Sequence, residues 1–536
     1  MSRGRSHNPP RSAEGEPTLV ELTALAKGRL INAVNAVNAE SNEAAAITVD
    51  SVSLDSAAVE EGGLFAAVPG TRVHGATFAA ASSAAAILTD EAGWDILAQA
   101  GELRPVIVVE DIRVVLGEVS ARVYGSPSKQ LTVLGVTGTS GKTTTTYLLE
   151  QGLMAAGLNV GLIGTTGTRI KGQEVPTSLT TPEAPKLQEL FARMLAGGVT
   201  HVVMEVSSHA LSLGRVNATA FAVAGFSNLS QDHLDFHPTM EDYFEAKAAF
   251  FDPASPAHAK RHVICIDDEW GVKLHARTPD ALTVGTRQQE GVDCSATLVD
   301  VTPTGAQHIS LSIAGQTHAV NLPLPGAFNV ANAALATAMA HVVGVDVAAF
   351  LRGLEGAAVP GRMERIDAGQ PFVAVVDYAH KPAAIEAALQ TLRGQVKGRI
   401  GIAVGAGGDR DSSKRPLMGR AAAQHADLVV VTDDNPRSED PAAIRAAVVA
   451  GCREAETGAH IREVKSRAEA IDQLIAWAKP GDAVIVVGKG HETGQLVGET
   501  LYPFDDREEM RRALAENGYR KGVDKHETTQ QHSERH

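Results

Sequence analysis

The chain has 536 residues, a formal net charge of −15 and 44% hydrophobic residues. At roughly 100–200 residues per domain, this length corresponds to about three to five domains, and the composition excludes a wholly disordered chain, a collagen-like repeat and a small disulfide-stapled scaffold. Three scattered cysteines give neither a disulfide framework nor a zinc motif, so we expect a cytoplasmic protein. The acidic balance disfavours a nucleic-acid partner, and no segment predicts a membrane span.

The order of apolar and polar segments predicts three α/β domains between two polar tails. Residues 1–17 and 521–536 are polar and are expected to be flexible. Residues 18–130 are predicted to form a small N-terminal α/β domain, 131–360 a central domain with a mostly parallel sheet, and 361–520 a C-terminal Rossmann-like α/β domain. Buried strands that alternate with helices favour parallel sheets with helical crossovers. We expect the protein to be a monomer.

A glycine-rich segment, GVTGTSGKTTTT, lies between an apolar strand and a helix at the start of the central domain. Glycines let backbone N–H groups approach phosphate oxygens, and a helix N-terminus favours an anion. Lys142 is expected to reach the terminal phosphates and Thr143 to ligate Mg²⁺, although Val136 stands where the strict P-loop motif has its first glycine. The segment therefore predicts an ATP site. Its expected contacts are Thr137, Gly138, Thr139, Ser140, Gly141, Lys142 and Thr143.

Two side chains that could hold a metal follow predicted strands of the central domain. Glu205 and His233 lie at or just past strand ends, where ligands of open α/β sheets gather, although a lone loop histidine can equally be structural. Lys247 lies four residues after Tyr243 on a predicted helix that begins at Thr239, so it shares a face with aromatic residues. Such a lysine either extends to the surface or, with its charge reversed as a carbamate, partners a metal.

The order of these motifs resembles that of a known family. GTSGKTTTT, MEVSSHAL, NLSQDHLDFH, YFEAKAAFF, DYAHKP, DNPR and GKGHE occur in the order found in the Mur ligases, and the resemblance extends from Ser51 to Arg512. It implies an enzyme of three domains, which hold a UDP-sugar, ATP and an incoming amino acid. It also implies Mg²⁺ and an ATP-dependent amide synthesis in the formation of peptidoglycan precursors. ATP would phosphorylate the D-glutamate carboxylate of UDP-N-acetylmuramoyl-L-alanyl-D-glutamate, and an amine would then displace the phosphate.

The resemblance also assigns roles to residues. Lys142, Lys247 and His233 would act in catalysis, with Thr143, Glu205, His233 and a carbamylated Lys247 around the metal. The residues implied to contact the UDP-sugar are Leu54, Ser56, Thr71, Arg72 and Val73. Those implied to hold the muramoyl-dipeptide are Thr180, Thr181, Ser207 and Arg215. Those implied to surround the nucleotide are Asn329, Asn332, Arg362, Asp377 and His380, although the two asparagines could instead cap a helix that begins near Val330.

The C-terminal domain is expected to select the amino acid. Two arginines beside an acidic residue form a receptor for a zwitterion. The guanidinium groups bind its carboxylate, and Glu492 binds its ammonium group. meso-2,6-Diaminopimelate has such a remote zwitterionic end, and the DNPR segment is typical of the family members that add it. The expected contacts are Arg410, Asp434, Asn435, Pro436, Arg437, Gly488 and Glu492.

Four other interpretations compete with this one. The first two are an enzyme that adds L-lysine and a ligase similar to folylpolyglutamate synthetase. The third is a nucleotide-binding protein without chemistry, although Glu205, His233 and Lys247 would be superfluous there. The fourth is a P-loop kinase, which would need no amine.

Overall fold

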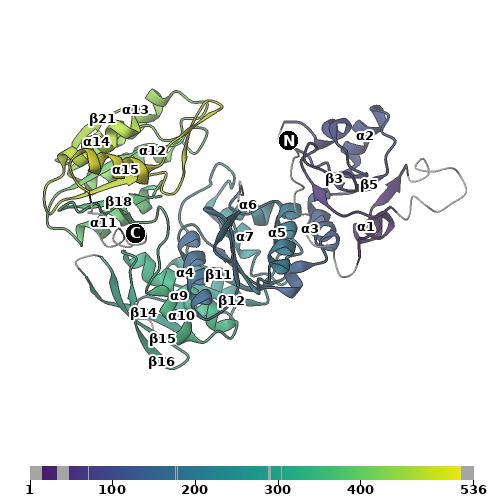
Figure 1. Cartoon of the computed structure of the whole chain (residues 1–536), viewed down its shortest axis with the longest axis horizontal. Coiled ribbons are helices and arrows are strands. Elements are labelled where there is room, and N and C mark those ends of the chain that lie inside the picture. The colour runs from purple at the N-terminus through teal and green to yellow at the C-terminus, as the bar shows by residue number, and fades with distance from the viewer. Residues whose placement is uncertain are drawn as a thin grey trace, which may run out of the picture.

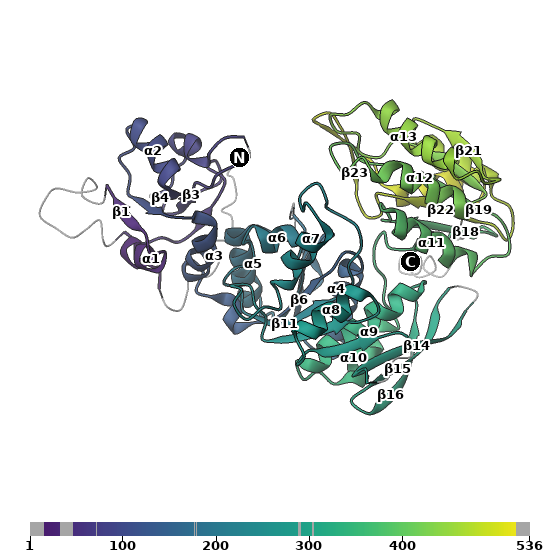
Figure 2. The ribbon, with the colours of Figure 1, turned by 180° about the vertical axis from the view of Figure 1, so that it is seen from behind.

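The structure is a computed structural model that describes residues 15–32, 47–70, 72–175, 177, 179–287, 291–302 and 305–520. Three α/β domains follow one another along the chain, and the N-terminal and C-terminal domains lie on opposite sides of the central one (Figures 1 and 2). The tails expected over 1–17 and 521–536 lie outside the described residues except for 15–17, and so does Thr71. No helix in the described part of the chain is long and apolar enough to cross a membrane.

The N-terminal domain is built on a five-stranded sheet of order β1-β5-β4-β3-β2. β1 is antiparallel to β5, and the other neighbours are parallel. Side-chain oxygens of Thr18, Asp90 and Asp111 accept hydrogen bonds from N–H groups of the helices that they precede, which fixes where these helices begin. The elements are α1 (Leu19–Leu25), β1 (Arg29–Ile31), β2 (Val52–Ser53), β3 (Leu64–Ala66), the 3₁₀ helix η2 (Gly75–Ala81), β4 (Ala86–Asp90), α2 (Glu91–Gln99), β5 (Val106–Val109) and α3 (Ile112–Val123).

The central domain contains an eleven-stranded sheet of order β16-β15-β14-β13-β12-β11-β6-β10-β7-β8-β9. Its strands from β14 to β7 in this order are parallel, and antiparallel pairs extend both edges. The strands are β6 (Thr132–Thr137), β7 (Val160–Gly164), β8 (Gly167–Ile170), β9 (Gln173–Val175), β10 (His201–Glu205), β11 (Phe221–Phe226), β12 (Arg261–Cys265), β13 (Leu282–Gly285), β14 (Cys294–Val301), β15 (Gln307–Ile313) and β16 (Gln316–Leu322). The helices are η3 (Pro127–Gln130), α4 (Lys142–Ala155), α5 (Ala184–Ala196), α6 (Ser208–Ser212), α7 (Met240–Ala248), α8 (Glu269–Arg277), α9 (Ala327–Val342) and α10 (Val347–Leu354).

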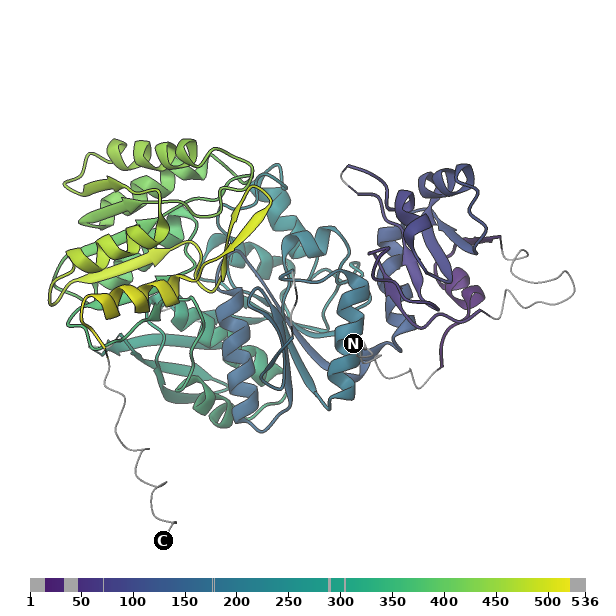
Figure 3. The ribbon, with the colours of Figure 1, turned by 45° about the horizontal axis from the view of Figure 1, so that its top comes forward.

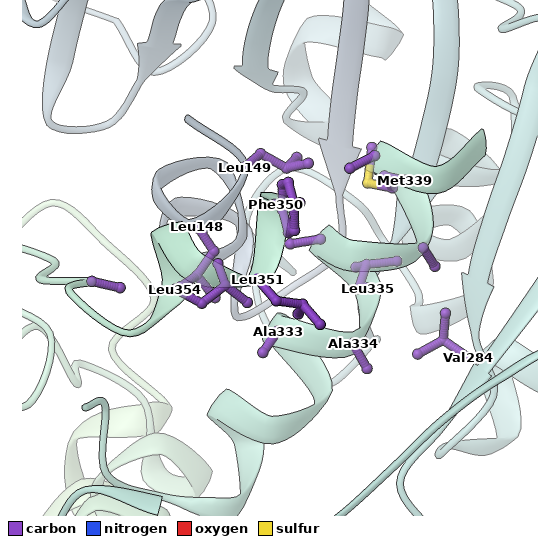
Figure 4. Close-up of a cluster of buried hydrophobic side chains, with 14 of the residues drawn as sticks. Leu148, Leu149, Val284, Ala333, Ala334, Leu335, Met339, Phe350, Leu351 and Leu354 are labelled. Carbon is purple, nitrogen blue, oxygen red and sulfur yellow. The ribbon is translucent and has the colours of Figure 1, made fainter. Parts of the chain in front are cut away.

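The central sheet has a hydrophobic core on each face. Leu134 and Val136 of β6 belong to one buried cluster and Val133 to the other, because successive side chains of a strand point to opposite faces. Figure 4 shows the first cluster where Leu148 of α4 and Phe350 of α10 pack with side chains of α9. Helix α4 thus packs against both α9 and α10, and this packing fixes the position of the loop before α4.

The C-terminal domain has a six-stranded sheet of order β17-β18-β22-β19-β20-β21, in which only β17 is antiparallel within the described residues. A two-stranded hairpin of β23 and β24 lies outside this sheet. The strands are β17 (Glu364–Arg365), β18 (Val373–Asp377), β19 (Ile400–Val404), β20 (Leu428–Val431), β21 (His460–Glu463), β22 (Ala483–Val487), β23 (Gly494–Val497) and β24 (Thr500–Pro503). The helices are α11 (Pro382–Arg393), α12 (Lys414–His425), α13 (Pro441–Glu454), α14 (Arg467–Trp477) and α15 (Asp506–Glu516).

The parallel register collects functional loops at one edge of the central sheet. Glu205, the last residue of β10, is aligned with Val136 of β6, and Phe226, the last residue of β11, is aligned with Thr137. The loops that follow these strands therefore start side by side. The C-terminal domain packs against the central domain (Figure 3), and the N-terminal domain contacts it through α3 and α5, where Arg113 Nη1 lies 3.8 Å from Glu183 Oε2.

Candidate active site

The loop between β6 and α4 depends on two glycines. Gly138 and Gly141 have φ angles of 141° and 88°, and a Cβ atom would lie 2.0 Å from Ser227 Oγ at the first and 2.3 Å from Asn332 Oδ1 at the second. Side chains are therefore excluded at both positions. The loop runs directly into α4, whose first turn has backbone N–H groups without helical acceptors. This geometry suits a phosphate group.

Lys142, the first residue of α4, turns back over this loop. Its Nζ donates hydrogen bonds to the carbonyl oxygens of Gly138 at 2.9 Å and Thr139 at 3.1 Å. Burial, together with the nearby Lys381 ammonium, lowers the pKa of Lys142 to about 8, whereas Glu205 opposes the shift. A second anion near this ammonium group, in addition to Glu205, would therefore stabilise the charged form of Lys142.

Thr143 and Glu205 are in direct contact. Thr143 Oγ1 donates to Glu205 Oε1 at 2.9 Å, and Thr165 donates to the same carboxylate from its N–H at 2.8 Å and from its hydroxyl at 3.0 Å. Arg362, from the start of the C-terminal domain, donates from Nη2 to Thr143 Oγ1 at 3.1 Å. The predicted hydroxyl and carboxylate ligands are thus adjacent, and an arginine that was expected near the nucleotide reaches them across the domain boundary.

Lys247 contacts the start of this loop, and the His233 ring lies 5.9 Å from that of Tyr243, on the same helix as Lys247. Lys247 is buried on α7, its Nζ donates to Gly138 O at 2.9 Å, and it lies 4.5 Å from the centre of the Tyr243 ring. The predicted aromatic face is therefore confirmed, and the alternative that this lysine extends to the surface is wrong. His233 has a φ of 53° and its Nε2 lies 3.0 Å from Asp232 Oδ2. Burial lowers the pKa of both His233 and Lys247, so that their neutral forms are favoured.

The donor set fits a hard cation that also binds phosphate oxygens. Within the described ranges no group of three His, Cys, Asp or Glu side chains is arranged to hold a metal ion. The Thr143 hydroxyl and the Glu205 carboxylate, however, offer the oxygen ligands that Mg²⁺ prefers, and Mg²⁺ normally keeps substrate phosphates and water among its ligands. A site with few protein ligands at the end of a phosphate loop is therefore consistent with Mg²⁺.

The structure adds an ion pair at the loop that the sequence analysis did not identify. Lys381 Nζ lies 2.7 Å from Asp232 Oδ2 and 3.4 Å from the acceptor Thr139 O. Asp232 and Lys381 each directly adjoin a histidine already expected at the site, in the segments QDHLDFH and DYAHKP. Their position next to these histidines in the sequence could have marked both residues as candidates. The sequence spacing, however, gave no reason to expect that the two segments meet.

The two asparagines of α9 lie inside the helix. The helix begins at Ala327, so the alternative that Asn329 and Asn332 cap a helix near Val330 is wrong. Asn332 Nδ2 donates to Asn329 Oδ1 at 3.0 Å, and Asn332 Oδ1 accepts from Thr145 Oγ1 at 3.4 Å. This chain of contacts ties α9 to the first turn of α4.

Asp377 and His380 follow β18 of the C-terminal domain. Asp377 accepts hydrogen bonds from the N–H groups of Met363 at 2.6 Å and Ala379 at 2.8 Å, and burial raises its pKa. His380 Nδ1 lies 2.9 Å from Tyr378 O, and burial lowers the pKa of its imidazole to about 3. These contacts fix the loop that carries Lys381 to the phosphate loop.

The four residues implied to hold the dipeptide cluster next to Glu205. Thr181 Oγ1 donates to Glu205 O at 2.8 Å and accepts from the Ser207 N–H at 3.2 Å. Arg215 Nη1 donates to Thr181 O at 3.4 Å, and the Thr180 hydroxyl lies 3.1 Å from that of Thr165. A substrate carboxylate held here would lie beside the Thr143–Glu205 pair.

The expected amino-acid contacts converge around Asn435. Asn435 Nδ2 donates to Glu492 Oε2 at 3.0 Å, and its Oδ1 accepts from Lys489 Nζ at 2.7 Å. Lys489 is fully buried and also lies 3.5 Å from Asp434 Oδ1; it lies within the GKGHE segment but was not identified in advance. Gly488 has a φ of 116°, and a Cβ atom there would lie 2.4 Å from Asp434 Oδ2. Burial raises the pKa of Glu492, and Asp434 raises it further.

The two arginines of the expected amino-acid pocket are held by backbone carbonyls. Arg437 has a φ of 51°, and its Nη1 donates to Gly408 O at 2.6 Å. Arg410 is exposed, and its Nη1 donates to Asp409 O at 3.1 Å. Pro436 O accepts from the Glu439 N–H at 3.1 Å, which shapes the turn between them.

The residues expected to contact the UDP-sugar are in loops of the N-terminal domain. Leu54 and Ser56 follow β2, and Arg72 and Val73 precede η2, with the Val73 side chain exposed. Thr71 lies outside the described residues. The structure places these positions in the N-terminal domain and does not bring them to the phosphate loop.

Comparison with known proteins identifies a family. Three family models match: "Mur ligase family, catalytic domain" over residues 48–124, "Mur ligase middle domain" over 136–340 and "Mur ligase, glutamate ligase domain" over 361–490. The UDP-N-acetylmuramoyl-L-alanyl-D-glutamate–2,6-diaminopimelate ligase of Corynebacterium glutamicum is 60% identical over 509 residues, which cover 93% of this chain and 98% of the relative. The protein of the same name from Streptomyces coelicolor is 46% identical over 475 residues, covering 87% of this chain and 92% of the relative.

Solved structures give the same result. A structure of UDP-N-acetylmuramoyl-L-alanyl-D-glutamate–2,6-diaminopimelate ligase matches with a TM-score of 0.62 and 32% identity, over 92% of this chain and 99% of that chain. Folylpolyglutamate synthase of Mycobacterium tuberculosis matches with a TM-score of 0.56 and 20% identity, over 69% of this chain and 91% of that chain, which shows a shared fold alone. The chain belongs to the Mur ligase family, and it is an ATP-dependent acid–amino-acid ligase.

Proposed function

We propose that this protein joins meso-2,6-diaminopimelate to the side-chain carboxylate of D-glutamate in UDP-N-acetylmuramoyl-L-alanyl-D-glutamate. The reaction consumes ATP, takes place in the cytoplasm and forms a peptidoglycan precursor. The observation that carries this proposal is the hydrogen bond between Arg362 and Thr143, because it joins the domain with the amino-acid pocket to the phosphate loop. The names of the relatives with 60% and 46% identity support the choice of substrates.

The phosphate loop supplies positive charge where two anions must meet. A carboxylate oxygen attacks the terminal phosphorus of ATP, ADP leaves, and an acyl phosphate forms. Lys142 and the N-terminus of α4 reduce the repulsion between the carboxylate and the phosphates. Thr143 and Glu205, with His233 and Lys247 nearby, would hold Mg²⁺, which when bound neutralises phosphate charge. The amine of diaminopimelate then attacks the acyl carbon, phosphate leaves, and the nitrogen loses a proton.

We propose that Lys247 carries a carbamate. Burial lowers its pKa well below the ordinary value, and the ammonium groups of Lys142 and Lys381 lower it further. A neutral amine adds CO₂ to form N–COO⁻ with release of one proton. The product gives this position a charge of −1 in place of the neutral amine, which suits a metal partner, while its N–H can still donate to Gly138 O.

The C-terminal pocket favours diaminopimelate over L-lysine. Arg437 and Arg410 would bind the remote carboxylate of diaminopimelate, and Glu492 would bind its remote ammonium group. L-Lysine lacks this second carboxylate. A folylpolyglutamate synthetase would leave the N-terminal UDP-binding positions and the DNPR segment without a use. The oligomeric state that we propose is a monomer, which light scattering after size-exclusion chromatography would test.

The proposed function is tested by measuring ADP release and product mass with the full-length protein, Mg²⁺ and UDP-N-acetylmuramoyl-dipeptide. We expect sustained ADP release and a new amide with meso-diaminopimelate, and at least tenfold lower kcat/KM with L-lysine, on the basis of one lost charge-assisted pair. Sustained ADP release without an amine would instead indicate a kinase. An absence of ADP release with every amine would indicate a binding protein.

A further inference from the structure

Three lysine side chains converge on two carbonyl oxygens of the phosphate loop. Lys247 and Lys142 both donate to Gly138 O, each at 2.9 Å. Lys142 also donates to Thr139 O at 3.1 Å, and Lys381 donates to that same oxygen at 3.4 Å. Lys142 and Lys247 belong to the central domain, whereas Lys381 comes from the C-terminal domain, immediately before α11.

This arrangement brings the Lys142 and Lys381 ammonium groups to one carbonyl oxygen. Cations that share an acceptor repel one another, and burial strengthens that repulsion because water screens it less. Lys381 is buried, and 10% of its side chain and of the Asp232 side chain is exposed. Among the ion pairs of the described residues, Lys381–Asp232 is the pair that links these lysines to a carboxylate. If Lys247 becomes a carbamate, Lys142 and Lys381 still form a cationic pair at Thr139 O.

We propose that Lys381 binds the terminal phosphate of the nucleotide, and that Asp232 holds its ammonium group at the loop before the phosphate takes its place. This inference rests on the proposed function. Lys381 follows His380 and precedes Pro382, the first residue of α11. It can therefore reach Thr139 only while the C-terminal domain is docked on the central domain. A cation delivered by another domain to a transferring phosphoryl group has the role of an arginine finger, here filled by a lysine.

The competing interpretation is a latch, in which Lys381 pairs with Asp232 only to hold the two domains together. A latch and a phosphate ligand differ in how they respond to nucleotide charge. Loss of a latch weakens the binding of every nucleotide by the same factor. Loss of a phosphate ligand weakens the binding of a triphosphate and leaves the binding of a monophosphate unchanged. The ratio of the two affinities therefore separates the interpretations.

The test compares K381M, K381R and D232N in the full-length protein. Calorimetry with Mg²⁺ measures binding of the β,γ-imido analogue of ATP and of AMP, and thermal unfolding checks that each variant folds. We expect K381M to bind the analogue at least tenfold more weakly, with AMP affinity within about twofold of wild type. K381R should recover much of the loss, because it keeps the charge. D232N should keep the wild-type ratio of the two affinities.

Turnover gives a second measure. We expect K381M to lower kcat on the order of 100-fold and K381R to lower it less, with the KM for diaminopimelate unchanged in both. The proposal would be overturned if K381M kept the wild-type affinity ratio, or if D232N lowered that ratio as much as K381M does. The binding assay needs no amino-acid substrate. If the wild type formed no amide, the proposed function would fail, while the affinity ratio would still decide the role of Lys381.

Discussion

The hydroxyl of Thr143 donates a hydrogen bond to Oε1 of Glu205 at 2.9 Å. The two residues are 62 positions apart in the chain, and the parallel pairing of β6 with β10 brings them together. Glu205 is 1% exposed, and its carboxylate is oriented by Thr165 as well as by Thr143. The pair is therefore a preorganised set of oxygen ligands rather than a chance surface contact.

Replacement of Thr143 by valine should remove this set without changing the side-chain volume much. We expect T143V to lower kcat on the order of 100-fold and to raise the Mg²⁺ concentration needed for half-maximal activity, because one oxygen donor is lost. T143S should retain most activity. The matched control is T146V on the same helix, since Thr146 Oγ1 donates only to Thr143 O within α4. Equal kcat and Mg²⁺ dependence in T143V and T143S would contradict this role.

Carbamylation of Lys247 should be visible by nuclear magnetic resonance. An ordinary lysine with a pKa of about 10.4 is neutral in roughly one molecule per thousand at pH 7.4, whereas the lowered pKa of Lys247 makes the reactive neutral amine abundant. In ¹³C-bicarbonate at pH 8 we expect one protected carbamate signal, which acidification removes. The signal should be absent in K247R and present in K273R, because Lys273 is a half-exposed lysine paired with Glu241. A spectrum of K247R that kept the signal would assign the carbamate elsewhere.

Arg437 should control the use of diaminopimelate. Because a charge-assisted hydrogen bond contributes about 1.5–3 kcal/mol, we expect R437A to raise the KM for diaminopimelate about 10- to 100-fold and to change the KM for ATP by less than about twofold. The matched control is R420A, since Arg420 forms an exposed pair with Glu454 on the same domain. Steady-state kinetics with each substrate varied in turn makes the measurement. A KM for diaminopimelate equal to that of R420A would rule out the assigned contact.

The fully buried pair of Arg467 and Asp506 should stabilise the C-terminal domain. Arg467 Nε and Nη2 each donate to Asp506 at 2.7 Å, both side chains are 0% exposed, and Nη2 also donates to Val487 O at 2.9 Å. Removing one partner leaves a buried charge, so we expect D506A to lower the free energy of unfolding by about 3–5 kcal/mol.

The control for this prediction is a surface pair on the same helix. Arg512 donates to Glu516 at 2.7 Å, and 61% of the Glu516 side chain is exposed. We therefore expect E516A to lower the free energy of unfolding by less than about 1 kcal/mol. Urea unfolding of the C-terminal domain within the full-length protein gives both values. If the two variants were equally stable, the buried pair would contribute no more than a surface one.

Much of the fold could be predicted because it depends on local patterns. The alternation of buried strands and helices predicted three α/β domains, and the structure contains them. The glycines of the phosphate loop were identifiable for the same reason, since their role is set by backbone geometry within a few residues. The helix start expected near Val330 was misplaced because α9 begins at Ala327, after Gly326, which has no side chain to cap it.

By itself, the sequence determined the class of this protein. Its motifs, in their order, indicated a nucleotide-binding ligase, and the spacing of Lys247 and Tyr243 indicated a shared helix face. Only the tertiary structure decided which groups meet. Lys381 and Asp232 are 149 residues apart by their positions in the chain, and they pair because two domains dock. Lys489 is buried against Asp434 and Asn435 because parallel strands end at one edge. Interactions between distant segments depend on how strands and domains pack together, which no local pattern encodes.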